Sequence, residues 1–133
     1  FENFKKHNTD LGTLTPAVDV EENSKFGNKY FKKELLTFLK LIEQEFNIEP
    51  IIYAPQKFYN LYLWRDFKKY DFWIARQHGI KRFPENNKTG KKPNLLSFKC
   101  PLIWQYSGTG TINGINAKVD LNITSKAIWD DEF

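Results

Sequence analysis

The feature that most constrains the fold is a long amphipathic segment at residues 28–46, followed almost directly by a short apolar segment at residues 50–54. Asn28 can cap the start of this predicted helix, and Asn47 can end it ahead of Pro50. The second segment, "PIIYA", opens with proline and is rich in strand-forming residues, so the helix leads directly into a strand. The apolar residues of the first segment recur at spacings of three and four, the period of one helical face; they are Phe31, Leu35, Phe38, Leu39, Ile42 and Phe46.

Further strands are predicted on both sides of this helix and strand. One ends in "LTPAVDVEEN" at residues 14–23, and the others are "DFWIARQ" at 71–77, "PLIWQYS" at 101–107 and, after a glycine-punctuated hairpin, "KVDLNI" at 118–123. Residues 1–10 resemble the end of a helix, and residues 55–70 a short helix and turn. Strands that alternate with helical segments are typical of an α/β fold with a parallel sheet, such as a β/α barrel.

Composition limits the class of protein. The chain has 133 residues, of which 41% are hydrophobic and 27% charged, which predicts one folded domain. No apolar run approaches the roughly 20 residues needed to cross a bilayer, so no membrane span is expected. The single cysteine, Cys100, can form no internal disulfide and is predicted to be a small buried apolar residue.

The net charge of +4 comes partly from a basic segment at residues 81–99. This segment is predicted to be a solvated loop. It could attract a polyanion, but it lacks the regular aromatic interleaving or module signature of a nucleic-acid binder, so nucleic acid is not an expected partner. His7 and His78 are too isolated to suggest a metal site.

Polar side chains follow or end each predicted strand. Ligands of α/β folds bind beyond the carboxyl ends of the strands, so these residues are candidates for one site. They are Asp19, Glu21, Tyr53, Arg76, Gln77, Gln105, Tyr106, Asp120 and Asn122.

The sequence "VDVE" sets Asp19 and Glu21 one residue apart. In a strand they share a face, with Cα atoms roughly 6.6 Å apart, while Val18 and Val20 face the other side. Two like charges so close resist joint ionisation, so one carboxyl can stay protonated near neutral pH, as a general acid requires. Glycoside hydrolysis uses such a protonated carboxyl with a second carboxylate. The alternative is that both acids simply end the strand in solvent or cap the next element.

Four pieces of the chain, in order, carry a family resemblance. They are "LTPAVDVEE", "PIIYAPQKFYNLYL", "YDFWIARQ" and "PLIWQYSGTGTINGINAKVDLNI". Together they resemble the family 25 glycoside hydrolases, lysozyme-like muramidases of bacteria and phages. Chitinase-like barrels also end a strand in Asp-x-Glu, but the final "WQYS" with "VDLN" does not belong to their usual pattern.

The resemblance implies roles for matching residues. Glu21 resembles the proton donor, Asp19 the partner that orients the N-acetyl group or stabilises positive charge, and Asp120 a third acid. It also implies that the glycan contacts come from Tyr53, Trp73, Arg76, Gln105 and Tyr106, although strand alternation can turn Arg76 away from the others. The implied reaction is hydrolysis of the β-1,4 bond between N-acetylmuramic acid and N-acetylglucosamine in peptidoglycan. It needs no metal or organic cofactor, and the implied location is extracellular or in the cell envelope.

The resemblance also implies an incomplete fold. Residues 1–133 match the C-terminal two-thirds of the family's barrel, so they are expected to form a single partial catalytic domain without the N-terminal strands and the further acid that these carry. Such a chain exposes an unpaired sheet edge, which can lead to self-association or strand swapping. An inactive glycan-binding or structural fragment is therefore the alternative to an enzyme.

Overall fold

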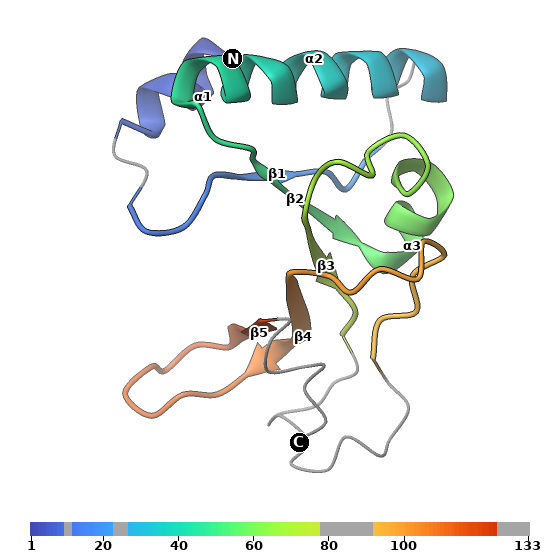
Figure 1. The fold of residues 1–133 in the computed structure, drawn as a ribbon. Coiled ribbons are helices and arrows are strands. Elements are labelled where there is room, and N and C mark those ends of the chain that lie inside the picture. The colour runs from blue at the N-terminus through green and yellow to red at the C-terminus, as the bar shows by residue number, and fades with distance from the viewer. Residues whose placement is uncertain (10–11, 23–26, 78–91, 125–133) are drawn as a thin grey trace.

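The computed structural model describes residues 1–9, 12–22, 27–77 and 92–124 (Figure 1). Their elements are the helices α1 (Glu2–His7), α2 (Asn28–Phe46) and α3 (Gln56–Phe58), the π-helical turn η1 (Tyr59–Leu63), and the strands β1 (Ala17–Asp19), β2 (Ile51–Pro55), β3 (Phe72–Ala75), β4 (Ile103–Gly110) and β5 (Val119–Thr124). This order of elements confirms the predicted α/β fold.

The strands form a single five-stranded sheet in which the spatial order follows the chain, β1-β2-β3-β4-β5. The first four strands are parallel, and β5 returns antiparallel to β4, as the predicted hairpin requires. Across the sheet Asp19 pairs with Tyr53 and Tyr53 with Trp73, while Gln105 pairs with Asn122. This register places polar and aromatic side chains from every strand within reach of one another.

Helix α2 lies along the part of the sheet formed by β1 and β2 (Figure 1). Its buried residues Leu35, Leu39 and Ile42 belong to the same core cluster as Val18 and Ile52 of the strands. Helix α1 adds to this layer, because its rings pack edge-to-face on those of α2, with centroids 5.6 Å apart for Phe4 and Phe38. The helix predicted at residues 28–46 has the same bounds in the structure, and the apolar residues that repeat every three or four positions form its buried face.

The caps of α2 confirm one prediction and correct another. Asn47 ends the helix in the left-handed conformation, with φ of 52°. At the start, however, Gly27 is the capping residue and makes no side-chain cap, so Asn28 is the first helical residue and not the cap. Gly27 has φ of 93°, a conformation that glycine adopts without a steric penalty.

Of two predictions for the loop before β4, one is confirmed where the structure describes it and the other is wrong. Residues 92–99 are irregular, as predicted, while the rest of the basic segment lies outside the described residues. Cys100 is exposed, so its predicted burial is wrong. It lies in the exposed stretch 98–100, between Leu95 and Pro101, which are both buried.

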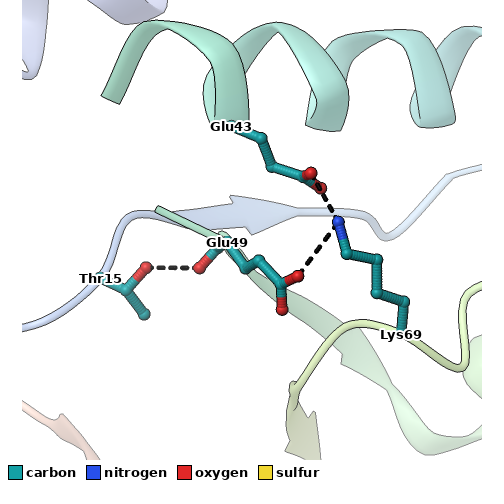
Figure 2. Close-up of polar contacts among 4 residues, drawn as sticks. All are labelled: Thr15, Glu43, Glu49 and Lys69. Atoms are coloured by element: carbon teal, nitrogen blue, oxygen red, sulfur yellow. Dashed lines mark hydrogen bonds and ion pairs between the residues drawn. The ribbon is translucent and has the colours of Figure 1, made fainter. Parts of the chain in front are cut away.

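A lysine joins three segments at the end of the sheet where β2 and β3 begin (Figure 2). Lys69 Nζ lies 2.6 Å from Glu43 Oε2 on α2 and 3.0 Å from Glu49 Oε1 before β2. Thr15, ahead of β1, donates to the backbone oxygen of Glu49 at 2.7 Å. These contacts connect the end of α2 to the starts of the parallel strands.

We expect Lys69→Met to lower the melting temperature slightly, because the ion pairs are partly exposed and such pairs contribute little. The pKa of Glu43 lies below its ordinary value, and the contact with Lys69 is the largest cause. A carboxyl with a lowered pKa stabilises the fold above its ordinary pKa and loses that effect as the pH falls through the lowered value. The difference in melting temperature should therefore be largest near neutral pH and disappear in acid. A difference that persisted in strong acid would contradict this account.

Candidate active site

The acidic pair lies at the end of β1 with the predicted alternation. Val18 and Val20 are buried in the core, while Asp19 and Glu21 are exposed on the opposite face of the sheet. Strand β1 ends at Asp19, but the Val20 amide still donates to the Tyr53 carbonyl at 2.9 Å. That bond keeps the chain extended beyond the strand, so Glu21 stays on the face that carries Asp19.

A cavity of about 350 Å³ opens on this face, away from the core under α2. All five strands or their ends contribute to its wall. The lining residues are Ala17, Asp19, Glu21, Tyr53, Trp73, Gln105, Asp120 and Asn122. Seven residues predicted as site candidates therefore surround one space: the acids Asp19, Glu21 and Asp120, with Tyr53, Trp73, Gln105 and Asn122.

Negative charges in the cavity raise the pKa of two of its residues, Glu21 and Tyr53. The negative charge of Asp19 is the largest cause that raises the pKa of Glu21, and desolvation and a hydrogen bond with Asp19 add to it. Glu21 therefore holds its proton to higher pH than an isolated glutamate. Burial raises the pKa of Tyr53, and the charges of Glu21, Asp19 and Asp120 raise it further. The phenol thus stays protonated beside the acids.

Hydrogen bonds fix the aromatic wall of the cavity. Tyr53 donates its hydroxyl proton to Gln105 Oε1 at 2.9 Å, and the Trp73 indole donates to Asn122 Oδ1 at 2.8 Å. The two rings meet edge-to-face, with centroids 5.3 Å apart. These contacts hold flat apolar surface next to carboxylates and amides, an arrangement suited to a sugar ring with its hydroxyl and acetamido groups.

Two predicted glycan contacts do not line this cavity. Arg76 donates instead to the backbone oxygen of Lys92, and Tyr106 is buried next to Trp104, with ring centroids 6.0 Å apart. Strand alternation is the physical reason, because Arg76 follows Ala75 and Tyr106 follows Gln105, so each points to the opposite face. The prediction that they contact the glycan is wrong for this cavity.

The lining includes one residue that was not predicted, Ala17, and one that was predicted only as a strand-end candidate, Asn122. Strand alternation could have found Ala17, because it shares a face with Asp19. Asn122 matters because it orients Trp73.

A second, larger hollow of about 850 Å³ lies between β1 and α2. It shares Asp19 and Glu21 with the cavity, and Phe31, Leu35 and Phe38 form its apolar side. Among the described residues β1 pairs only with β2, so this hollow adjoins the unpaired edge of the sheet. The acids therefore stand between the cavity and an open sheet edge, as expected for an incomplete barrel.

Two features of the described ranges concern metal ions and membranes. No group of three or more His, Cys, Asp or Glu side chains there is arranged to hold a metal ion. None of the helices in those ranges is long and apolar enough to cross a membrane.

Comparisons with known proteins place these features in a family. The sequence model described as "Glycosyl hydrolases family 25" matches residues 1–115. The uncharacterized protein YegX of Escherichia coli K12 is 32% identical over 112 residues, which cover 84% of this chain and 37% of YegX. The chain thus spans little more than a third of this curated relative.

Solved structures agree. A family 25 glycosyl hydrolase from Bacillus anthracis is 27% identical, with a TM-score of 0.65, over 84% of this chain and 49% of that one. The catalytic domain of the endolysin ply40, from bacteriophage P40 of Listeria monocytogenes, is 28% identical, with a TM-score of 0.58, over 84% of this chain and 50% of that one. The chain therefore carries about half of the fold found in each of these structures.

Proposed function

Because this chain belongs to glycosyl hydrolases family 25, we propose that it forms part of an active site that hydrolyses the β-1,4 bond between N-acetylmuramic acid and N-acetylglucosamine in peptidoglycan. The observation that carries the proposal is the acidic cavity in which Asp19 raises the pKa of Glu21. The likeness of the chain to the structures of a family 25 hydrolase and a phage endolysin supports it.

In the proposed mechanism Glu21 donates its proton to the glycosidic oxygen as the bond to the anomeric carbon breaks. Asp19 and Asp120, from opposite ends of the sheet, place negative charge near the oxocarbenium-like centre that forms. Asp19 thus has two effects, since it raises the pKa of the acid and stabilises developing positive charge. Water then attacks the anomeric carbon, and its proton passes to a carboxylate of the cavity.

The proposed substrate contacts come from the wall of the cavity. The faces of Tyr53 and Trp73 offer apolar surface to a pyranoside ring, and Gln105 offers amide hydrogens to an acceptor oxygen. We also propose that residues 1–133 form one part of a catalytic domain, that the partners are peptidoglycan glycan strands, that no cofactor takes part, and that the protein acts at the cell envelope.

The bond cleaved is tested by product analysis. The protein, expressed with whatever residues flank it in its gene, is incubated with purified peptidoglycan, and the new reducing ends are reduced with borohydride and identified by mass spectrometry. We expect reduced N-acetylmuramic acid. New reducing ends on N-acetylglucosamine would overturn the bond assignment. Binding of the glycan without new reducing ends would favour the alternative, a glycan-binding fragment. That alternative is compatible with the chain covering about half of each solved structure.

The charge of Asp19 also predicts a pH effect. In Asp19→Asn the neighbouring charge is lost, so the pKa of Glu21 falls toward its ordinary value. As the pH rises, Glu21 then loses its proton at a lower pH than in the parent protein. The alkaline limb of the activity profile should therefore move to lower pH, in addition to any loss of rate. The control is Asp66→Asn, which removes an exposed carboxylate paired with Lys32 and should leave the limb in place. A limb that stayed unchanged in Asp19→Asn would contradict the assignment of Glu21 as the acid.

A further inference from the structure

The amide of Gln105 is held from two sides. Its Oε1 accepts from the Tyr53 hydroxyl at 2.9 Å and from Gln77 Nε2 at 3.2 Å. An amide oxygen has two acceptor positions, so these bonds use both. No hydrogen bond among the described residues uses Gln105 Nε2, whose hydrogens remain for a ligand in the cavity that Gln105 lines.

Gln77 reaches this position because the neighbouring strand carries a glycine. A Cβ built on Gly108 of β4 would lie 2.7 Å from Gln77 Oε1, 2.8 Å from its Nε2 and 2.9 Å from its Cδ. The Gln77 amide therefore packs closely against the backbone of Gly108. Any side chain at position 108 displaces that amide from its place beside Gln105.

We propose that Gln77 is a positioning residue that fixes the amide of Gln105, so that Gln105 presents its N–H groups to an acceptor oxygen of the substrate. The acceptor class is a carbonyl or hydroxyl oxygen, as in an acetamido sugar. The identity of the ligand as a glycan rests on the proposed glycosidase function. The orientation of the Gln105 amide rests on the described contacts alone.

The physical reason is the symmetry of an amide. Without Gln77, the Gln105 amide keeps only the contact with Tyr53, and the Tyr53 hydroxyl can either donate to Oε1 or accept from Nε2. The two orientations then become similar in energy, and only one of them offers N–H to the cavity. In the described geometry Gln77 presents its Nε2 to Gln105, which favours the orientation that offers N–H to the cavity.

The first test is Gln77→Ala. We expect the dissociation constant of a peptidoglycan tetrasaccharide to rise about three- to tenfold, the effect of one lost neutral hydrogen bond. KM should rise by a similar factor, with a smaller change in kcat, because the contact is made in ground state and transition state alike. The matched control is Gln44→Ala, on the exposed side of α2, which should bind as the parent does.

The second test is a double-mutant cycle with Gly108→Ala. The new methyl strikes the end of a flexible side chain, so the fold should tolerate it while the Gln77 amide moves away. We expect Gly108→Ala to weaken binding as Gln77→Ala does, but to have no further effect in the Gln77→Ala background, where that amide is gone. Additive losses would overturn the inference, because Gly108 would then act by another route.

The third test keeps the shape of the side chain and changes its polarity. Above the ordinary pKa range of glutamate, Gln77→Glu can only accept hydrogen bonds, so it should draw Gln105 Nε2 toward itself and away from the cavity. Binding should then be as weak as in Gln77→Ala or weaker. Parent-like binding in Gln77→Glu would show that Gln77 acts only by filling space, which contradicts the proposal.

A ligand-free measurement separates this inference from the proposed function. Side-chain amide signals of Gln105 in ¹⁵N–¹H spectra should change in Gln77→Ala and Gly108→Ala but not in Gln44→Ala. Unchanged Gln105 signals would overturn the positioning role whatever the activity. Changed signals in a protein that neither binds nor cleaves the glycan would instead overturn the proposed function and leave the positioning role intact.

Discussion

Glu21→Gln is expected to reduce the rate of peptidoglycan hydrolysis by about 10²- to 10⁴-fold, the usual contribution of a general acid. Glutamine keeps the size of the side chain but cannot deliver a proton. Glu21 is the proposed acid because the charge of Asp19 raises its pKa inside a cavity lined by two aromatic rings and a third acid. Clearing of a cell-wall suspension, followed by turbidity, measures the effect.

Glu22→Gln is the matched control, because it makes the same change at the next residue, which does not line that cavity. We expect it to clear the suspension nearly as fast as the parent. A Glu21→Gln protein that is folded by circular dichroism and clears at the parent rate would exclude Glu21 as the acid.

Leu39→Ala is expected to lower the free energy of unfolding by about 2–5 kcal/mol, the usual range for a large-to-small change in a core. Leu39 is fully buried, with 0% of its surface exposed, in the core cluster between α2 and the sheet. Its removal leaves a cavity among residues that cannot collapse freely, because the strands fix their spacing.

Leu41→Ala on the same helix is the control for this change. Its side chain is 37% exposed, so the same truncation should cost far less. Urea denaturation followed by circular dichroism measures both variants. Equal losses for the two leucines would contradict the placement of α2 on the sheet.

Much of the fold could be predicted because local patterns determine it. The spacing of Leu35, Leu39 and Ile42 is enough to specify the helix and its buried face. The π-helical turn η1 was not predicted, because its aromatic residues fit a short α-helix equally well. The error at Asn28 has a similar origin, since the pattern favours an asparagine cap while the chain enters the helix through Gly27.

The candidate site was predictable where strand ends and alternation specify it, as for Asp19, Glu21 and Tyr53. Tyr106 was predicted wrongly although alternation excludes it, since neighbouring residues of a strand cannot both face one cavity. The contact of Gln77 with Gln105 could not be predicted in this way. It depends on the register that pairs Ala75 with Gln105, and sequence pattern does not give register between distant strands.

The strand order has a consequence for how the protein is made. Each strand of the sheet pairs with the strand that follows it in the chain. The ribosome releases the chain from its N-terminus, so each strand emerges after the preceding strand with which it pairs. The sheet can therefore grow during synthesis without waiting for a distant segment. We expect residues 17–75 to acquire the β1-β2-β3 pairing before the last strands leave the ribosome.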